Sequence, residues 1–351
     1  MKLIPYKSFS WDFHKKNWQR GKPNVCQFEI TFKCDFHCKY CYSDCYNNPY
    51  YIDRELSTKE VKLILDKIYK AGVIWLCFTG GDPLTRNDFL DIYSYVKRRG
   101  FIITVFTNGY SINKEIIKEF KKKPPFVIEI TLNTVTKSLY ENIVGLSHSF
   151  EKVMENVRLI LEAKLPLKIK TQVIKDNLEE IPNIKKYIRS LGLVFRPTVL
   201  LNPRLNGDPY PCSLRISPQQ ALNIFGNRVK FDDGCDIDRF KQTNKNLFRC
   251  AIGGGDGVHI DPYGNIFPCL CIREPKVNLL KEDFKVAREK ILTWLRSRDF
   301  TYESKCKMCS VGELCYRCPG KALLEVGDME APIPYFCDFA QEIAKRIYCR
   351  A

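Results

Sequence analysis

Long apolar runs are missing from this chain of 351 residues. Because no stretch of about 18 or more uncharged apolar residues occurs, the sequence predicts no transmembrane helix and no membrane partner. The first residues also lack an apolar core followed by small residues, which is the pattern of a secretory signal. We therefore expect a cytoplasmic protein.

Acidic residues are fewer than basic ones, and histidines are rare. The chain has 40 Asp and Glu against 56 Lys and Arg, for a formal net charge of +16, and only 4 His. The basic residues are spread out, with short runs such as Lys121 to Lys123, unlike the dense basic segments typical of nucleic-acid binding. The charge favours an acidic partner, and an acidic peptide is as good a candidate as a nucleic acid.

Cysteine, by contrast, is abundant, with 17 residues. In a short secreted chain this number would predict a disulfide framework. This chain is long enough for one large domain and one smaller one, and most of its cysteines are spaced like metal ligands. We therefore expect thiol ligands rather than disulfides.

The most informative cysteines are Cys34, Cys38 and Cys41, a Cys-x3-Cys-x2-Cys run directly after the apolar, β-prone segment 25–32. Three thiolates in so short a loop cannot complete the four-ligand shell of zinc or of an ordinary four-cysteine cluster. One ligand position therefore stays open. A structural zinc site, or thiols without a ligand role, are the alternatives.

This run, with Tyr40 before its third cysteine, resembles the cluster motif of the radical S-adenosylmethionine (SAM) superfamily. The resemblance implies a [4Fe-4S] cluster on Cys34, Cys38 and Cys41 whose open iron is chelated by SAM. It further implies that one electron from the cluster cleaves SAM to methionine and a 5′-deoxyadenosyl radical.

Short β-branched runs alternate with helical stretches from Val25 onward, which is the pattern of an α/β fold with a parallel sheet. Ser57 and Glu60 form a capping-box signature at the start of one helix, and Gly100 follows the end of another. Six strands are expected, near residues 25–31, 74–80, 102–108, 126–132, 167–173 and 193–200. Six such units suit the partial (β/α)6, TIM-like barrel of the radical SAM superfamily, with its chemistry at the carboxyl ends of the strands.

Composition divides the chain into four parts. We expect an N-terminal arm over residues 1–24, the partial barrel over 25–201, a Pro-, Gly- and Asn-rich linker with a bridging helix over 202–239, and a small cysteine-rich domain over 240–351. The bridging helix is expected to begin near Pro218, and the last helix to run from Cys337 to Tyr348.

Polar turns follow the predicted second and third strands. Thr79-Gly80-Gly81-Asp82-Pro83 has two glycines that let the backbone turn close to a ligand, and an acidic side chain that could receive an ammonium group. Thr107-Asn108-Gly109 carries small polar groups that could hydrogen-bond a ribose. Tight turns without a ligand are the alternative at both places.

By resemblance, both turns belong to the SAM pocket, and Gly-Gly-Asp-Pro stands where the superfamily usually has Gly-Gly-Glu-Pro to hold the amino group of SAM. Val144 stands where many relatives have an arginine near the SAM carboxylate, and Lys170 is a candidate to replace it. The residues expected to bind SAM are Tyr40, Gly80, Gly81, Asp82, Pro83, Thr107, Asn108, Gly109, Thr131 and Gln172.

A second group of cysteines lies near the C-terminus: Cys250, Cys269, the quartet Cys306-x2-Cys309-x5-Cys315-x2-Cys318, and Cys337. Their spacing resembles the SPASM domain, which holds two auxiliary [4Fe-4S] clusters in enzymes that modify peptides and proteins. The resemblance implies one cluster on Cys306, Cys309, Cys315 and Cys337, and another on Cys250, Cys269 and Cys318. Cys271, Cys235 or a substrate thiol is the candidate fourth ligand of the second cluster. A zinc ribbon over residues 306–318 is the alternative.

Both resemblances together imply an enzyme in which the radical takes hydrogen from a substrate and an auxiliary cluster accepts an electron or binds the substrate. The segment from Pro203 to Ser217 resembles the branch that modifies ribosomally synthesised peptides by crosslink, thioether or backbone excision. The expected partners are an acidic precursor peptide, a separate protein that binds its leader, and an electron donor such as flavodoxin or ferredoxin.

Three other functions stay open at the level of sequence. The chain could serve tetrapyrrole or small-molecule cofactor biosynthesis, or it could mature another enzyme. A non-catalytic iron-sulfur protein that binds RNA would explain the charge, but it would leave the Gly-Gly-Asp-Pro and Thr-Asn-Gly turns without a role. Nucleic acid is therefore the less favoured partner.

Overall fold

The computed structural model describes residues 20–225, 247–248, 257–301 and 303–348, together with residues 10, 12–14 and 16–17. Its centre is a nine-stranded sheet with the strand order β6-β5-β4-β3-β2-β1-β7-β8-β9. The strands are β1 Val25–Thr31, β2 Trp75–Gly80, β3 Ile102–Thr107, β4 Val127–Thr131, β5 Leu167–Gln172, β6 Arg196–Thr198, β7 Gly257–Ile260, β8 Asn265–Phe267 and β9 Val277–Asn278. Strands β1 to β7 pair in parallel with their neighbours, whereas β8 and β9 are antiparallel additions.

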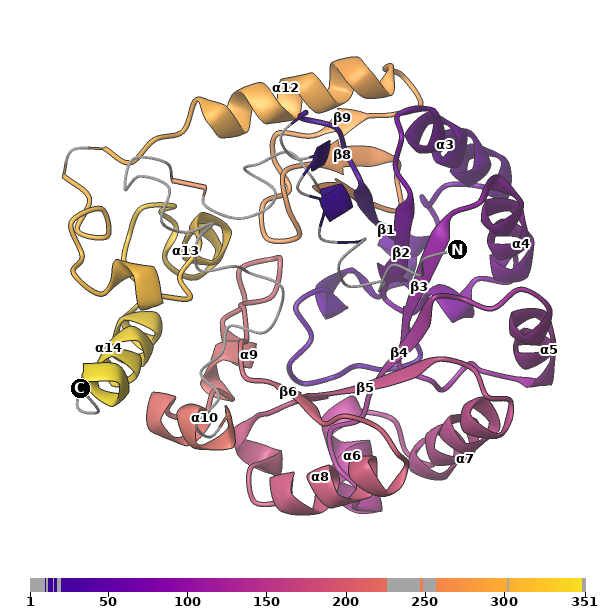
Figure 1. The fold of residues 1–351 in the computed structure, drawn as a ribbon, viewed down its shortest axis with the longest axis horizontal. Coiled ribbons are helices and arrows are strands. Elements are labelled where there is room, and N and C mark those ends of the chain that lie inside the picture. The colour runs from indigo at the N-terminus through magenta and orange to yellow at the C-terminus, as the bar shows by residue number, and fades with distance from the viewer. Residues whose placement is uncertain are drawn as a thin grey trace.

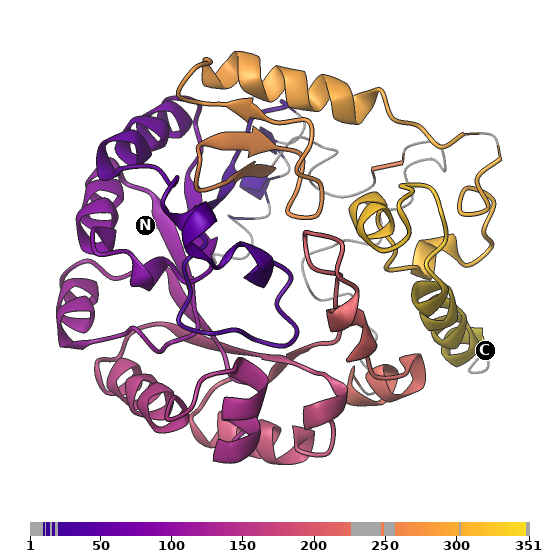
Figure 2. The same ribbon diagram turned by 180° about the vertical axis from the view of Figure 1, so that it is seen from behind.

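Helices surround this sheet as an outer ring, which Figures 1 and 2 show from opposite sides. The helices are α2 Pro49–Ile52, α3 Thr58–Lys70, α4 Phe89–Arg99, α5 Lys114–Lys122, α6 Lys137–Val144, α7 Phe150–Glu162, α8 Ile181–Ser190, α9 Tyr210–Ser213, α10 Pro218–Phe225, α12 Phe284–Arg296, α13 Pro319–Val326 and α14 Pro334–Tyr348. Short 3-10 turns cover Asp44–Tyr46, Pro83–Thr85, Lys175–Asn177 and Gly312–Leu314. The architecture is the expected α/β partial barrel. Among the described residues, no helix has the length and apolarity that a membrane crossing requires.

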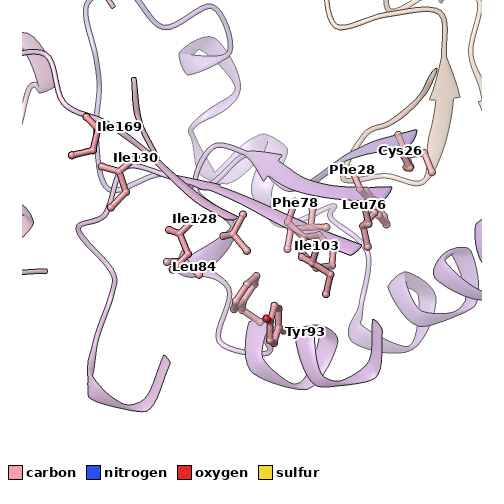
Figure 3. Close-up of a cluster of buried hydrophobic side chains, with 14 of the residues drawn as sticks. Cys26, Phe28, Leu76, Phe78, Leu84, Tyr93, Ile103, Ile128, Ile130 and Ile169 are labelled. Atoms are coloured by element: carbon pink, nitrogen blue, oxygen red, sulfur yellow. The ribbon is translucent and has the colours of Figure 1, made fainter. Parts of the chain in front are cut away.

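The two faces of the strands differ in chemistry. Phe28, Phe78, Ile103, Ile130 and Ile169 point toward the helices and have no exposed surface (Figure 3). Burying a side chain of this size stabilises the fold by about 1.5–3 kcal/mol. Because side chains alternate along a strand, the opposite face carries the residues between them. These include Glu29 and Thr79 on β1 and β2, and the ion pair of Glu129 with Lys170 on β4 and β5. The interior of the partial barrel therefore contains buried polar and charged side chains.

Most sequence-based boundaries are confirmed. Five of the six expected strands agree within about one residue at each end, the Ser57 and Glu60 capping box is present at α3, and Gly100 ends α4 in the left-handed region with φ of 87°. Strand β6 is shorter than expected. Pro197 lies at its centre and has no N–H to donate, which restricts it to a short edge strand.

The sequence did not predict that the chain returns to the barrel sheet. Strand β7 pairs in parallel with β1, with Cys26 opposite Val258 and Phe28 opposite Ile260, and β8 and β9 extend the same sheet. A strand of four residues that begins at a glycine carries too little periodicity to be recognised. Helix α14 begins at Pro334, three residues before the expected Cys337, as proline favours the first turn of a helix.

Candidate active site at the carboxyl ends of the strands

The cysteine loop follows directly after β1 and is held in shape by Asn47. The Asn47 side-chain oxygen accepts a hydrogen bond from the Cys34 N–H at 3.1 Å, and its amide nitrogen donates to the carbonyl oxygens of Cys34 at 3.0 Å and Phe36 at 3.3 Å. One side chain therefore satisfies three backbone groups of the loop. Asn47 lies 13 residues after Cys34, so no local motif predicted this role.

Replacement of Asn47 by alanine is expected to loosen the cysteine loop. The variant loses three hydrogen bonds, and at about 0.5–1.5 kcal/mol each we expect about 2 kcal/mol less stability and poorer iron incorporation. Asn48→Ala is the matched control, because Asn48 donates one bond, to the Cys45 carbonyl at 3.1 Å. Urea unfolding and iron counting under anaerobic conditions measure both effects. Equal behaviour of the two variants would contradict the role of Asn47.

The other side of the loop rests on the end of α6. The His37 N–H donates to the Val144 carbonyl at 2.9 Å, and the Lys39 N–H donates to the Ile143 carbonyl at 3.0 Å. A side chain on Gly145 would place its Cβ 2.9 Å from the His37 carbonyl oxygen, so glycine is required by this close approach. The Val144 side chain is buried, and its carbonyl holds the loop. A buried valine offers no positive charge to a carboxylate.

The three thiols of the loop lie within electrostatic reach of one another. Burial raises the pKa of Cys34, and the charges of Asp82, Cys38 and Cys41 raise it further. Burial also raises the pKa of Cys38 and of Cys41. Thiols in such a setting are poor anions by themselves, but a bound cationic iron centre replaces the proton and stabilises the thiolate. The donor set therefore fits an iron-sulfur cluster.

The Gly80-Gly81 turn packs against the backbone just before the cysteine loop. The Gly81 N–H donates to the Thr31 carbonyl and the Asp82 N–H to the Lys33 carbonyl, each at 2.8 Å. A Cβ on Gly80 would lie 2.0 Å from the Thr31 oxygen, and one on Gly81 would lie 2.3 Å from the Lys33 oxygen. The sequence predicted that these glycines approach a ligand. In the structure they allow the ends of β1 and β2 to approach each other.

Gly81→Ala is expected to push the Gly-Gly turn away from the cysteine loop. Its Cβ would meet backbone atoms, which cannot rotate aside, so we expect a loss of about 1–3 kcal/mol and a shift in SAM affinity. Gly72→Ala is the control, since its Cβ would meet nothing within 4 Å and only its φ of 93° is unfavourable. Thermal unfolding and SAM binding by calorimetry compare the two. A stable Gly81→Ala variant with unchanged affinity would refute this close-packing argument.

The Asp82 side chain makes its hydrogen bonds within the protein. Its carboxylate is fully buried and accepts hydrogen bonds from the Leu84 N–H at 2.9 Å, the Thr107 hydroxyl at 2.7 Å and the Asn108 N–H at 2.7 Å. Burial raises the pKa of Asp82 to about 6, against the effect of these donors. The side chain thereby ties the end of β2 to the end of β3, and Pro83 starts the 3-10 turn beside it. The predicted contact of this turn with the ammonium group of SAM stays a prediction.

The Thr107-Asn108-Gly109 turn thereby meets the cysteine loop. The Asn108 amide nitrogen lies 3.6 Å from the Cys34 sulfur, and its oxygen accepts from the Tyr110 N–H at 2.7 Å. Gly109 has φ of 86°, which the turn requires. The sequence predicted these residues for the SAM pocket, and the structure brings them to the edge of the cysteine loop. Their contact with a ribose stays a prediction.

A hydrogen-bonded network joins the loop to β4 and β5. Asn133 donates to the Tyr40 hydroxyl at 2.7 Å and accepts from the Gln172 N–H at 2.9 Å. The Gln172 amide nitrogen donates to the Thr198 carbonyl at 3.1 Å, so this side chain holds the end of β6. Thr131 lies half-buried at the end of β4. The predicted SAM residues Tyr40, Thr131 and Gln172 therefore share this edge of the sheet.

Lys170 does not point to a free site. Its ammonium pairs with Glu129 and lies 4.5 Å from the centre of the Phe106 ring. It would have to leave Glu129 in order to bind a SAM carboxylate. The structure therefore gives the suggested replacement for the superfamily arginine no support.

Two groups of cysteines gather in the C-terminal region. The Cys315 thiol lies close enough to Cys306, Cys309 and Cys337 for their charges to raise its pKa, to about 11, after the larger effect of burial. Cys269 and Cys271 form a hydrogen-bonded thiol pair in which the pKa of Cys269 is raised and that of Cys271 lowered.

Cys318 lies near this pair. Its charge raises the pKa of Cys269, and its sulfur accepts from the Lys321 N–H at the start of α13. A Cβ on Gly320 would lie 2.8 Å from the Cys271 Cβ, so α13 and the cysteine pair are in direct contact. Cys271 therefore lies where the predicted second group needs a further ligand. Cys250 and Cys235 lie outside the described residues.

The spread of these thiols bears on the zinc alternatives. In the part of the chain that the structure describes, no three His, Cys, Asp or Glu side chains converge closely enough to hold a single metal ion. A four-iron cluster binds each thiolate through a different iron and so accepts more widely spaced sulfurs. The auxiliary clusters of the C-terminal region stay a prediction.

Comparisons with known proteins agree with this geometry. The AdoMet-dependent heme synthase of Methanosarcina barkeri is 24% identical over 339 residues, which are 89% of this chain and 96% of that protein. The PqqA peptide cyclase of Bradyrhizobium diazoefficiens is 27% identical over 167 residues, 47% of this chain and 43% of that protein.

Solved structures share the fold. SuiB of Streptococcus suis bound to its precursor peptide SuiA has a TM-score of 0.66 at 16% identity, over 94% of this chain and 80% of that one. The enzyme anSMEcpe with bound AdoMet and the Kp18Cys peptide has a TM-score of 0.67 at 16% identity, over 93% and 98%. Residues 28–188 match the model of the radical SAM superfamily. With the cysteine loop and the parallel barrel described above, this match identifies residues 28–188 as a radical SAM domain.

Proposed function

We propose that the enzyme modifies a ribosomally synthesised peptide, by a crosslink, a thioether or backbone excision, and that it carries two auxiliary [4Fe-4S] clusters beside the SAM-binding one. The superfamily cofactors, a [4Fe-4S] cluster and SAM, supply a 5′-deoxyadenosyl radical. Residues Cys34, Cys38 and Cys41 would hold this cluster. The two cysteine groups of the C-terminal region would hold the others, as in a SPASM domain over residues 240–351 behind a linker over 202–239.

The observation that carries this proposal is the gathering of seven described cysteines besides the first three. They form a quartet, a pair, and Cys318 close to that pair. A radical on a substrate carbon must finally lose an electron if a new bond is to form, and nearby clusters provide an acceptor. The likeness to SuiB with its precursor peptide and to anSMEcpe with a cysteine-containing peptide, over more than nine-tenths of this chain, supports a peptide substrate.

The charge of the protein fits an acidic peptide. The net charge of +16 raises the local concentration of acidic partners, and four lysines of α5 line an open groove against α7 (Lys114, Lys118, Lys121 and Lys122). A separate leader-binding protein and an electron donor such as flavodoxin or ferredoxin complete the proposed set of partners.

A second candidate is tetrapyrrole chemistry. The heme synthases are matched over almost their whole length, whereas the peptide cyclase is matched over less than half of its own. A tetrapyrrole with several carboxylates would also suit the basic charge of this protein. This candidate therefore enters the same experiment.

The test supplies both substrate classes to the anaerobically reconstituted enzyme with dithionite and SAM. One reaction receives a synthetic candidate precursor, a short acidic or cysteine-rich peptide sought among the neighbouring reading frames, and the other receives iron-coproporphyrin III. Mass spectrometry that finds hydrogen loss or chain cleavage in the peptide, together with 5′-deoxyadenosine, supports the proposal. Decarboxylation of the porphyrin with an unchanged peptide would overturn it in favour of the second candidate.

A further inference from the structure

The linker segment from Pro203 to Asp208 has no role in the proposals above, yet it lies against the first cysteine loop. The Leu205 N–H donates to the Tyr42 carbonyl at 2.8 Å, directly after Cys41. The segment closes on itself, since the Arg204 N–H donates to the Asp208 carbonyl at 2.8 Å and the Gly207 N–H to the Arg204 carbonyl at 2.9 Å. A rigid turn from another part of the chain thus covers the end of the loop.

Asp44 connects this turn to the cysteines. One of its carboxylate oxygens lies 3.0 Å from His37 Nδ1, and the other accepts from the Arg204 guanidinium at 2.9 Å. His37 stands between Cys34 and Cys38 in the sequence, so the carboxylate is tied to the loop on one side and to the linker on the other. The Asp44 and Arg204 side chains are only 14% and 16% exposed.

The two charges have opposite effects on the loop. The Asp44 carboxylate lies three residues after Cys41 and 3.0 Å from His37 Nδ1, so its negative charge repels further negative charge on the loop. The same repulsion would oppose the addition of an electron to a cluster held by these thiols. A guanidinium 2.9 Å away offsets the carboxylate. Water screens this pair poorly because both groups are mostly buried.

Asp208 lies on the other side of the guanidinium. Its carboxylate is 43% exposed and lies 3.1 Å from Arg204 Nε, which makes no hydrogen bond to a described residue, and the same side chain accepts from the Tyr210 N–H at 2.9 Å. Arg204 is therefore held between two carboxylates, and its position does not depend on the cysteine loop alone. An exposed ion pair contributes little to either stability or potential. The pair of Arg204 with Asp44 is the largely buried one.

We propose that Arg204 is a positioning residue that fixes Asp44 beside the first cysteine loop and neutralises its charge, so that the linker sets the reduction potential of the SAM-binding cluster. The proposal concerns the cluster of the superfamily and does not depend on whether the substrate is a peptide or a tetrapyrrole.

The test is a redox titration of the reconstituted full-length enzyme, monitored by EPR. The signal of the SAM-binding cluster is recognised because it changes when SAM is added. In Arg204→Gln the unpaired Asp44 carboxylate is expected to make one-electron reduction roughly threefold to tenfold less favourable, a shift of about 30–60 mV to lower potential. Asp44→Asn is expected to shift it by a similar amount to higher potential. The double variant is expected to return close to the wild-type value.

Two further variants separate charge from shape. Arg204→Lys keeps the charge without the planar geometry and is expected to stay near the wild-type potential. Arg98→Gln removes one exposed positive charge from α4 and is expected to change nothing. If Arg204→Gln fails to hold the cluster, Asp44→Asn still decides the question. Unchanged or lower potential in Asp44→Asn, or equal shifts in the Lys and Gln variants of Arg204, would overturn the proposal.

Discussion

Replacement of Cys34, Cys38 and Cys41 together by alanine is expected to abolish the release of 5′-deoxyadenosine from SAM completely. These three thiols lie in the loop between β1 and the 3-10 turn Asp44–Tyr46. The next described cysteine, Cys45, lies in that turn. Without them no cluster delivers an electron to SAM. Iron content is expected to fall by about four per chain.

Cys45→Ala is the matched control for this variant. Cys45 lies four residues after Cys41 and contacts the Tyr42 carbonyl through its thiol at 3.9 Å. We expect this variant to keep its iron and its SAM cleavage. Anaerobic reconstitution, iron counting and mass spectrometry of SAM products give both readouts. Intact SAM cleavage in the triple variant would refute the assignment of the first cluster.

The sequence predicted what is local. Strand positions followed from the alternation of β-branched runs with helical patterns, and the cysteine loop followed from three thiols at fixed spacing after β1. The same reasoning placed the Gly-Gly-Asp-Pro and Thr-Asn-Gly turns at neighbouring strand ends. Parallel strands bring their carboxyl ends to one edge, so the meeting of these motifs needed no knowledge of distant contacts.

The sequence could not predict how distant side chains complete the site. Arg204 reaches Asp44 across 160 residues, and Arg273 reaches Glu29 across 244. The contacts that Asp82 and the two glycines make within the protein could not be predicted for the same reason. Whether a carboxylate faces a ligand or neighbouring N–H groups depends on how closely β1, β2 and β3 approach, and a residue pattern does not contain that distance.

Glu29 and Arg273 form the contact that joins the barrel to the second group of cysteines. Glu29 lies on the inner face of β1 and is fully buried. The Arg273 guanidinium donates to its two oxygens at 2.5 Å and 3.0 Å and lies 4.5 Å from the centre of the Phe267 ring. Arg273 follows two residues after Cys271, at the end of a tight turn in which the Ile272 N–H donates to the Cys269 carbonyl at 2.8 Å. The ion pair therefore fixes the position of the Cys269 and Cys271 thiols relative to β1.

Glu29→Gln is expected to destabilise the protein by about 3–5 kcal/mol, because it leaves the Arg273 charge buried without its partner. We also expect the variant to lose about four irons after reconstitution, since the turn that carries Cys269 and Cys271 is no longer held against the barrel. SAM cleavage by the first cluster is expected to persist, which separates this effect from general unfolding. Anaerobic urea unfolding, iron counting and 5′-deoxyadenosine release measure the three quantities.

Two controls decide whether the buried charge is the cause. Glu274→Gln removes the partner of Lys276 from an ion pair of 2.6 Å, in which the Glu274 side chain is 69% exposed and that of Lys276 48%. This variant is expected to lose less than about 1 kcal/mol of stability. The double variant Glu29→Leu with Arg273→Met removes both charges and is expected to recover most of the stability, because no unpaired charge stays buried. If Glu29→Gln behaved like Glu274→Gln, the cysteine turn would have to be held against the barrel by its apolar contacts alone.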